Sequence, residues 1–378
     1  MRKIRVLHYL DSLGRGGGEM QVLDVCRNAD SAGFNMTLAA AGGGSLESDF
    51  RDTPVEFVRF DRKFPVDLFL ASQLRKLIKD REIEIVHGYQ AVDGLHIYLA
   101  TRGLKGVKTV LSFQGFIPDK RNRLISRFLI PRMNANIAVS RGLQKWLAEN
   151  DGLDTARNFS VVYNGADPDR LKPTGKSVRK ELKLPDSSLL IGMTGAFYRD
   201  PRKDQLTVCK ALPKVFAQVP NVHCIFAGRI EDGAEDKFAD CVSFCIENNI
   251  TDRVHFLGAR ADVPDILAEL DVFIFSSLQE GLPVAVSEAM LAGVPMIVSD
   301  IEPLLEASGN GRFAEVFRVG DHRALSEKML KLIMDERCRS ELAGNAREFA
   351  CENFSIHSHL RDLRALYENL IRNGGGAE

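Results

Sequence analysis

The sequence lacks the features of a membrane-spanning or nucleic-acid-binding protein. No stretch of its 378 residues is apolar for long enough to cross a bilayer, and the first apolar run stops at Asp11, which is short for a secretion signal and suits a β-strand. Lys and Arg total 50 against 51 Asp and Glu, so the excess of positive charge typical of a nucleic-acid partner is missing. At roughly 150 residues per domain, the length predicts two or three globular domains.

Cysteine pairs at the spacings of zinc sites are also missing. Cys241 and Cys245 lie four positions apart on a predicted helix, but without a second pair helix packing is favoured over metal binding. Most cysteines lie in apolar runs, so we expect reduced core residues in a cytosolic protein. The seven are Cys26, Cys209, Cys224, Cys241, Cys245, Cys338 and Cys351.

Short apolar runs alternate with segments of helical periodicity along the whole chain. The intervals hold predicted crossover helices, for example at 73–80, 204–219 and 324–338. Apolar strands separated by helices predict parallel sheets that are covered on both faces. The predicted strands are 4–10, 35–41, 56–60, 84–89, 108–113, 135–140, 159–164, 189–197, 223–228, 254–258, 272–277, 295–300 and 314–319.

Thirteen strands are too many for one such sheet, whereas two sheets of six or seven fit. Residues 165–188 are rich in Gly, Pro, Asp and Lys and have little apolar periodicity, so they predict a linker. We therefore predict an α/β protein with two Rossmann-like parallel-sheet domains that face each other across a cleft. Their bounds are 1–166 and 167–355, with a C-terminal helix in 356–378 that packs back on the first domain and a frayed GGGAE end.

Ligands of open parallel sheets bind beyond the carboxyl ends of the strands, and a glycine-rich loop follows the first strand. Gly16, Gly17 and Gly18 let the backbone approach a ligand, and the following helix N-terminus favours an anion. This predicts a phosphate site, with a tight strand–helix turn as the alternative. Glu19 stands where a dinucleotide fingerprint requires glycine, and the second strand ends without an acidic residue, so a nicotinamide enzyme is disfavoured.

Two motif-like segments fall in the predicted linker. Thr174-Gly175-Lys176-Ser177 looks like the tail of a P-loop, but Arg170 replaces its first glycine and no strand feeds it directly. Asp167-Pro168-Asp169 spells D-x-D and is typical of a turn. Neither predicts a phosphate or metal site.

The densest motif is FSSLQEGLPVAVSEAMLAGVPM at 275–296. A buried strand leads into a short loop, and a helix then runs to Gly293 and Pro295. Glu280 lies on the loop, and Glu288 lies about one and a half turns into the helix. The loop and helix entry, Gly281, Leu282 and Pro283, offer backbone donors to a phosphate or sugar oxygen.

These motifs resemble the retaining GT-B glycosyltransferases, most closely family 4. EGLPVAVSEAMLAGVPMIVSD is similar to the E-x7-E signature of that family, and the glycine-rich loop resembles its first loop. The interdomain strand and linker, the donor-phosphate segment and the strands beside the nucleotide base are matched by VVYNGADPDRLKP, GMTGAFYRDPRKDQLTVCKAL, FAGRIEDG and VHFLGARADVPDIL. The resemblance spans most of the chain in the order of the family, and it implies a GT-B fold.

The resemblance also implies roles in donor binding. Lys203 and Arg199 would contact the diphosphate, where catalysis needs positive charge on the leaving group. Gly195-Ala196 stands where the family has Gly-Arg, which leaves Arg199 and Arg202 as candidates for that arginine; a solvated turn is the alternative for these cations. Glu280 would contact the transferring sugar beside the amides of Gly281 and Leu282. Glu288 would hold the ribose hydroxyls, unless it is a surface glutamate, and Arg260 would lie at the base, acting largely through its backbone.

His87 ends the fourth predicted strand and is a catalytic candidate if it faces the cleft. The alternative is a hydrogen-bonded histidine at a strand end. Gln114 stands where the family often has a histidine, and an amide cannot act as a base near neutral pH. The resemblance implies retention by front-side attack, with the leaving phosphate taking the proton of the acceptor. It implies no metal and no cofactor besides the donor sugar nucleotide.

The acceptor is expected on the first domain, where residues 118–132 interleave five cations with Leu, Ile and Phe. Lys120, Arg121, Arg123 and Arg127 are candidates for contact with an anionic membrane or a lipid diphosphate. A solvated amphipathic helix explains the pattern nearly as well.

The sequence thus predicts a retaining, metal-independent glycosyltransferase. It would move a hexose from a nucleoside diphosphate sugar to a polysaccharide or lipid-linked glycan. We expect it in the cytoplasm, at the inner face of the membrane, without a nucleic-acid partner. The alternatives are a GT-B nucleotide-sugar epimerase and a non-catalytic sugar-nucleotide-binding subunit of a glycan assembly complex. The base, the sugar, the acceptor, the oligomeric state and the effect of Gln114 on activity are open at this point.

Overall fold

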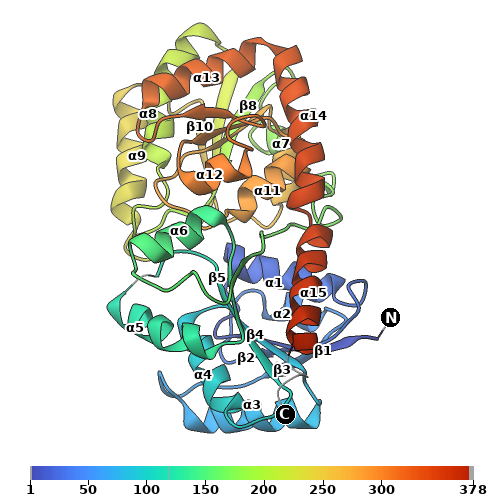
Figure 1. The fold of residues 1–378 in the computed structure, drawn as a ribbon. Helices are drawn as coiled ribbons and strands as arrows, with labels where there is room; N and C mark the ends of the chain where they lie inside the picture. Colours follow the sequence, from blue (N-terminus) through green and yellow to red (C-terminus); the bar gives the residue numbers. More distant parts are fainter. Residues whose placement is uncertain (1, 118, 374–378) are drawn as a thin grey trace. The chain divides into compact units, whose positions relative to one another are not determined.

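The computed structural model describes residues 2–117 and 119–373, which form two compact α/β units (Figure 1). The first unit comprises the chain up to Gly165 together with the chain from Ile356 onward, and the second runs from Ala166 to Ser355. Each unit contains one parallel sheet and its own buried core. The expected frayed GGGAE end lies outside the described residues.

The first unit is built on a seven-stranded sheet in the order β3-β2-β1-β4-β5-β6-β7, with every neighbouring pair parallel. Strand order reverses between β1 and β4, which places a topological switch point there. The strands are β1 Ile4–Leu10, β2 Phe34–Ala40, β3 Glu56–Arg59, β4 Ile85–Gly88, β5 Lys108–Phe113, β6 Ala135–Ala138 and β7 Phe159–Val161.

Helices cover both faces of this sheet. Apolar side chains of α1 and α15 pack on one face and those of α3 and α4 on the other. Successive β1 side chains alternate between the two, as the period of a strand requires: Val6 lies in the α1–α15 core and Leu7 in the α3–α4 core. The helices are α1 Gly17–Asn28, α2 Glu47–Arg51, α3 Leu68–Asp80, α4 Ala91–Thr101, α5 Lys120–Leu129, the short 3-10 helix Ile130–Arg132, α6 Arg141–Glu149 and α15 Ile356–Asn373.

The second unit repeats this plan with a six-stranded parallel sheet in the order β10-β9-β8-β11-β12-β13. Its switch point lies between β8 and β11. The strands are β8 Leu189–Thr194, β9 Val222–Ala227, β10 Val254–Gly258, β11 Val272–Phe275, β12 Met296–Ser299 and β13 Glu315–Phe317. The helices are α7 Val178–Glu181, α8 Gln205–Gln218, α9 Glu235–Glu247, α10 Val263–Glu269, α11 Val284–Leu291, α12 Glu302–Ala307, α13 His322–Met334 and α14 Glu336–Asn353.

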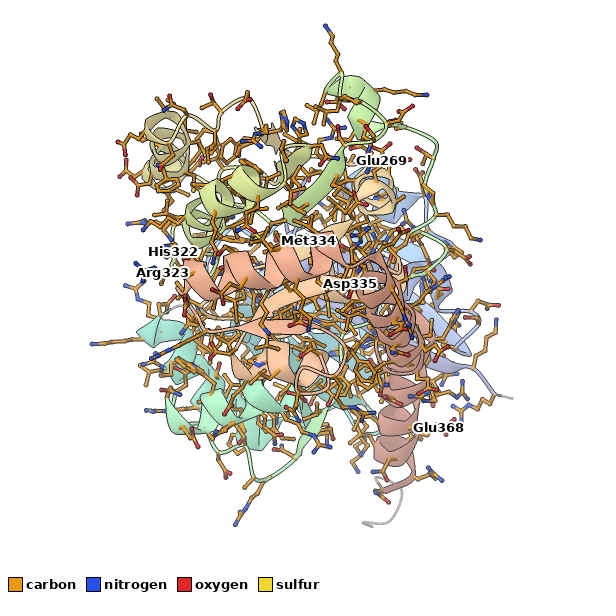
Figure 2. The ribbon with its side chains drawn as sticks, turned by 90° about the horizontal axis from the view of Figure 1, so that it is seen from above. Glu269, His322, Arg323, Met334, Asp335 and Glu368 are labelled. Carbon is orange, nitrogen blue, oxygen red and sulfur yellow. The ribbon has the colours of Figure 1, made fainter. Side chains whose placement is uncertain are left out.

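The predicted fold of two Rossmann-like parallel-sheet domains is confirmed, and each predicted strand overlaps an observed one. The single helix predicted over 324–338 is wrong. Figure 2 labels Met334 and Asp335, where α13 ends and α14 begins. Asp335 has non-helical dihedral angles, and its carboxylate accepts a hydrogen bond from the backbone N–H of Cys338 at 2.9 Å. An N-cap of this kind starts a new helix.

Most of the cysteines are packing residues. Cys26, Cys209, Cys224, Cys241 and Cys245 are buried, and the last two pack from α9 into the core of the second unit. In the described part of the chain, no helix is both long and apolar enough to cross a membrane.

Candidate active site

Two loops meet at the switch point of the second unit. One follows β8 and the other follows β11, and the antiparallel bridge between Lys203 and Ser277 joins them. The N–H of Leu278 donates to the carbonyl of Arg202 at 2.7 Å, and that of Asp204 donates to Ser276 at 3.1 Å. Backbone hydrogen bonds therefore fix the side chains of both loops at the carboxyl edge of the sheet, where ligands of such sheets bind.

Lys203 and Glu280 form an ion pair at this edge, with Nζ 2.5 Å from Oε1. The same carboxylate oxygen accepts a hydrogen bond from the Ser277 hydroxyl at 2.7 Å. The side chains of Lys203 and Glu280 are only 8% and 11% exposed, so the solvated turn is wrong for Lys203. The structure thus brings together two of the predicted catalytic residues.

The surroundings of Lys203 hold its ammonium group in place. The ammonium lies 3.8 Å from the centre of the Phe275 ring. Gly195, at a φ of +155°, leaves room for the lysine stem, because a Cβ there would lie 3.3 Å from Lys203 Cε. Burial lowers the pKa of Lys203, although Glu280 opposes this shift. A buried cation with a single carboxylate partner suits a site where negative charge develops.

Glu288 projects from α11 and pairs with Arg170, with Oε1 2.8 Å from Nη2. Glu288 is only 9% exposed, so the surface-glutamate alternative is wrong. Arg170 lies in the segment that follows Ala166, far from α11 in sequence. The pair ties the start of the second unit to the helix that carries the second glutamate.

The helix entry before Glu288 is buried. Gly281, Leu282 and Pro283 all lie below the surface, and Pro283 is the N-cap of α11 with an extended conformation. The first turn of a helix has backbone N–H groups without intrahelical partners, and it favours anions. The predicted backbone donors therefore lie at the same edge as Lys203.

The two candidate arginines differ in their partners. The guanidinium of Arg202 bonds Asp200, with Nε 2.7 Å from Oδ1, and lies 4.4 Å from the Tyr198 ring centre. Arg199 is exposed, and its stem lies against Gly233. Among the described residues no ion pair occupies Arg199. This favours Arg199 over Arg202 as the cation that a ligand can reach.

Arg260 is engaged by two carboxylates. Its nitrogens lie 2.7 Å and 2.8 Å from the oxygens of Glu181, and 2.8 Å and 2.7 Å from those of Asp262. Hydrogen bonds to Glu181 and Asp262 hold the pKa of Arg260 above its ordinary value. The side chain of Arg260 is therefore occupied, and its backbone, to which the resemblance gave the larger part, is the candidate for contact with a base.

In the first unit, the glycine-rich loop opens α1, with Gly16 as the N-cap and Gly17 as the first helical residue. A Cβ on Gly18 would lie 3.7 Å from Cγ of Gln114, so the loop lies next to Gln114, which stands where the family often has a histidine. Ser12 donates to Glu19 at 3.3 Å in the first turn of the helix. The structure therefore places Gln114 beside the predicted phosphate loop.

His87 does not face a solvent-filled site. It is 1% exposed, with Nδ1 2.6 Å from the Tyr367 hydroxyl and Nε2 2.7 Å from that of Ser112. Tyr367 also bonds His8 at 3.2 Å, and His8 bonds Tyr89 at 2.6 Å. Burial, followed by the charge of His8, holds the pKa of His87 well below its usual range. The alternative of a hydrogen-bonded histidine at a strand end is correct, and we withdraw His87 as a catalytic candidate.

The four cations on α5 divide into two pairs. Arg123 lies 2.9 Å from the Asp151 carboxylate, and Arg127 donates to the Asp151 carbonyl at 2.9 Å. These two arginines hold the fold together, which makes them poor candidates for an acceptor or membrane. Lys120 and Arg121, at the start of α5, are exposed.

The two linker motifs are structural. The backbone N–H groups of Thr174, Gly175 and Lys176 donate to Asp265 Oδ1 at 2.6, 2.9 and 3.1 Å. The P-loop-like segment thus surrounds an internal carboxylate. In the D-x-D segment, Asp167 accepts from the N–H of Asp169 at 2.9 Å, as in a turn. Within residues 2–117 and 119–373, no group of three or more histidine, cysteine or carboxylate side chains is suited to hold a metal.

Arg170 and Ser277 were not predicted as site residues from the sequence. Ser277 lies two positions after the end of the buried strand β11 and three positions before Glu280, so its place beside that carboxylate could have been predicted. Arg170 stands 118 positions from Glu288 and carries no local signal.

Comparison with known proteins agrees with this architecture. The model of Glycosyltransferase Family 4 matches residues 15–170, and that of Glycosyl transferases group 1 matches 188–335. The chain is 26% identical to N-acetyl-alpha-D-glucosaminyl L-malate synthase of Bacillus anthracis, over 82% of this chain and 80% of that protein. It is also 26% identical to UDP-Gal:alpha-D-GlcNAc-diphosphoundecaprenol alpha-1,3-galactosyltransferase of Escherichia coli, over 81% of each.

The solved structure of Anabaena HepE in complex with UDP is similar in fold, with a TM-score of 0.84 at 18% identity over 97% of this chain and 100% of that one. The two family models cover one unit each, and both name glycosyltransferases. Together with the paired Rossmann-like sheets, these matches show that the chain belongs to the group 1, family 4 glycosyltransferases of GT-B fold.

Proposed function

We propose that this glycosyltransferase moves a hexose from a nucleoside diphosphate sugar to a lipid-linked or polysaccharide glycan, with retention of configuration and without a metal. The buried pair of Lys203 and Glu280 at the switch point of the second unit carries the proposal. A fixed cation there stabilises the diphosphate as it leaves, and a carboxylate beside it accepts hydrogen bonds from sugar hydroxyls.

The second unit is the proposed donor domain. Glu288 would accept from the two ribose hydroxyls, and its contact with Arg170 holds the carboxylate in position. Arg199 would add charge to the diphosphate. The first turn of α11 and the loop of Gly281 and Leu282 would donate backbone hydrogen bonds to phosphate and sugar oxygens.

The first unit is the proposed acceptor domain, and its glycine-rich loop of Gly16, Gly17 and Gly18 would approach the donor phosphate. Because His87 is buried and residue 114 is a glutamine, no histidine base is available at these two positions. This supports front-side attack, in which the leaving phosphate oxygen takes the proton from the acceptor hydroxyl.

The names of the two relatives suggest different acceptors. One is an N-acetyl-alpha-D-glucosaminyl L-malate synthase, which suggests malate as its acceptor, and the other is named for a diphosphoundecaprenol-linked sugar. Exposed cations at Lys120 and Arg121 favour the second kind, a lipid diphosphate at a membrane surface, and therefore a cytoplasmic enzyme at the inner face.

Thermal-shift measurements with UDP-, GDP- and ADP-hexoses, each compared with its free nucleoside diphosphate, test the donor site. UDP comes first, because the galactosyltransferase relative is named for UDP-Gal. Ligand at about 100 times its dissociation constant adds roughly 2.7 kcal/mol of stability. We expect a shift with one base, weaker in Glu288→Gln and unchanged in Glu341→Gln, a control at an exposed position.

Activity is then measured as release of that nucleoside diphosphate, with a lipid-diphosphate sugar and with malate as acceptors. NMR coupling of the anomeric proton in the first product formed reports retention or inversion. Ligand binding without turnover on either acceptor argues against these acceptors, and an inverted product overturns the mechanism. No shift with any sugar nucleotide overturns the donor site.

A further inference from the structure

The first unit exposes a short apolar segment between β3 and α3. Residues 63–69 read Lys-Phe-Pro-Val-Asp-Leu-Phe. Exposed apolar residues that occur singly are ordinary, but four large ones within six positions form a patch that indicates an interaction surface. The four, with their exposed fractions, are Phe64 at 65%, Val66 at 49%, Leu68 at 70% and Phe69 at 69%.

Hydrogen bonds hold this segment in its exposed conformation. The buried carboxylate of Asp67 caps α3 by accepting from the N–H groups of Phe69 and Leu70, both at 3.0 Å, and from that of Lys63 at 2.9 Å. The N–H of Asp67 donates to Nε2 of His96 on α4 at 3.0 Å. Asp67 thus faces inward while its apolar neighbours face outward.

Apolar side chains continue across the neighbouring helices. In the first unit α4 packs between α3 and α5 (Figure 1). Leu95 and Leu99 on α4 are half-buried. The ring centres of Tyr98 on α4 and Phe128 on α5 lie 5.4 Å apart. Phe128 and Leu124 are themselves 40% and 64% exposed. Exposed or half-buried apolar side chains thus occur on all three of these helices.

Cations border this surface. Lys63 precedes Phe64, and Lys120 and Arg121 lie one turn before Leu124. These three side chains are exposed, and none of them takes part in an ion pair within the described parts of the chain. Arg132 lies with its guanidinium 3.9 Å from the Phe128 ring centre. A two-fold dimer through this face would bring the same cations from both copies into one interface, whereas anionic lipid headgroups would neutralise them.

We propose that the first unit binds the surface of an anionic bilayer through this face, with Phe64, Val66, Leu68 and Phe69 entering the boundary between headgroups and acyl chains. The role of this membrane contact rests on the proposed function, because a lipid-linked acceptor is anchored in the bilayer. Vesicle binding needs neither donor nor acceptor, so it can fail while transfer to a water-soluble acceptor analogue persists, and the reverse also holds.

Co-sedimentation of the full chain with vesicles tests this inference. The vesicles contain equal parts of phosphatidylcholine and phosphatidylglycerol, with phosphatidylcholine alone for comparison. We expect Phe64→Ser/Leu68→Ser/Phe69→Ser to lower the partition coefficient at least about tenfold. The control Ile246→Ser/Met334→Ser, at positions 60% and 71% exposed on the second unit, should bind like the wild type. Lys120→Glu/Arg121→Glu should weaken binding to the anionic vesicles.

Unchanged binding of the triple variant, or no binding of the wild type, overturns the inference. So does a wild-type dimer in sedimentation velocity that the triple variant dissociates, since the face would then bind a second copy. Phe69→Trp gives a check that does not depend on loss of binding. Brominated lipids should quench its fluorescence beyond that of the wild type, which contains Trp146 alone, and equal quenching also overturns the inference.

Discussion

Lys203 and Glu280 stand 77 positions apart and form a buried ion pair, so activity and stability should respond differently to their replacement. Lys203→Met removes the cation at the proposed diphosphate and leaves the carboxylate buried without its ammonium. We expect turnover to fall roughly 10²- to 10³-fold and the free energy of unfolding to fall by about 3–5 kcal/mol. Initial rates and urea unfolding measure the two effects.

The double variant Lys203→Met/Glu280→Gln separates the effects. A neutral pair removes the uncompensated charge, so most of the lost stability should return while turnover stays low. Recovery of turnover together with stability would mean that the pair acts only in folding.

His8 and His87 should make the first unit sensitive to acid. Burial lowers the pKa of His8 to about 3 and holds that of His87 well below the ordinary value of a histidine. The unfolded chain binds protons on both rings below about pH 6.5, so stability falls as the pH drops from there toward the folded pKa values. At pH 5 the loss from His8 alone is about 2 kcal/mol.

Urea unfolding between pH 7.5 and 5 measures this loss. His87→Gln should flatten the dependence on pH, whereas His357→Gln, at an exposed position of α15, should leave it unchanged. Equal slopes for the wild type and His87→Gln would show that the ring is already charged in the folded protein.

At the scale of elements, Asp265 secures the segment that enters the second unit. Its carboxylate accepts three backbone hydrogen bonds and one from the Thr174 hydroxyl at 2.8 Å. Asp265→Ala leaves these donors without their acceptor, and we expect the free energy of unfolding to fall by about 3 kcal/mol. Asp252→Ala, at an exposed position, is the control. A loss of less than about 1 kcal/mol would mean that water replaces the carboxylate.

The elements themselves were predictable because their signals are local. Strand starts follow from apolar runs, but predicted ends extended too far where buried loop residues continue the run, as at Phe197 after β8 and Ser277 after β11. Contacts between distant positions left no such signal. The pairing of Arg170 with Glu288 and the capping of 174–176 by Asp265 depend on the tertiary fold, and so does the enclosure of His87.

At the scale of the whole molecule, each unit has its own core, so unfolding should not follow a two-state course. We expect calorimetry to resolve two transitions. The nucleoside diphosphate that binds should raise the transition of the second unit more than that of the first, because the proposed donor residues Lys203, Glu280 and Glu288 all belong to the second unit. Glu288→Gln should reduce this shift. A single transition, or equal shifts of both, would contradict this assignment.

The first unit is assembled from both ends of the chain, and this has a consequence during synthesis. Tyr367, which is fully buried, and its neighbours on α15 are translated only after the whole second unit. A ribosome that has exposed β1–β7 therefore holds a sheet with one face still lacking its final helix. The second unit can close while its own residues emerge, whereas the first must wait until α15 has been made. The first unit is thus translated earlier but completes its core later than the second, and its apolar surface stays exposed for longer.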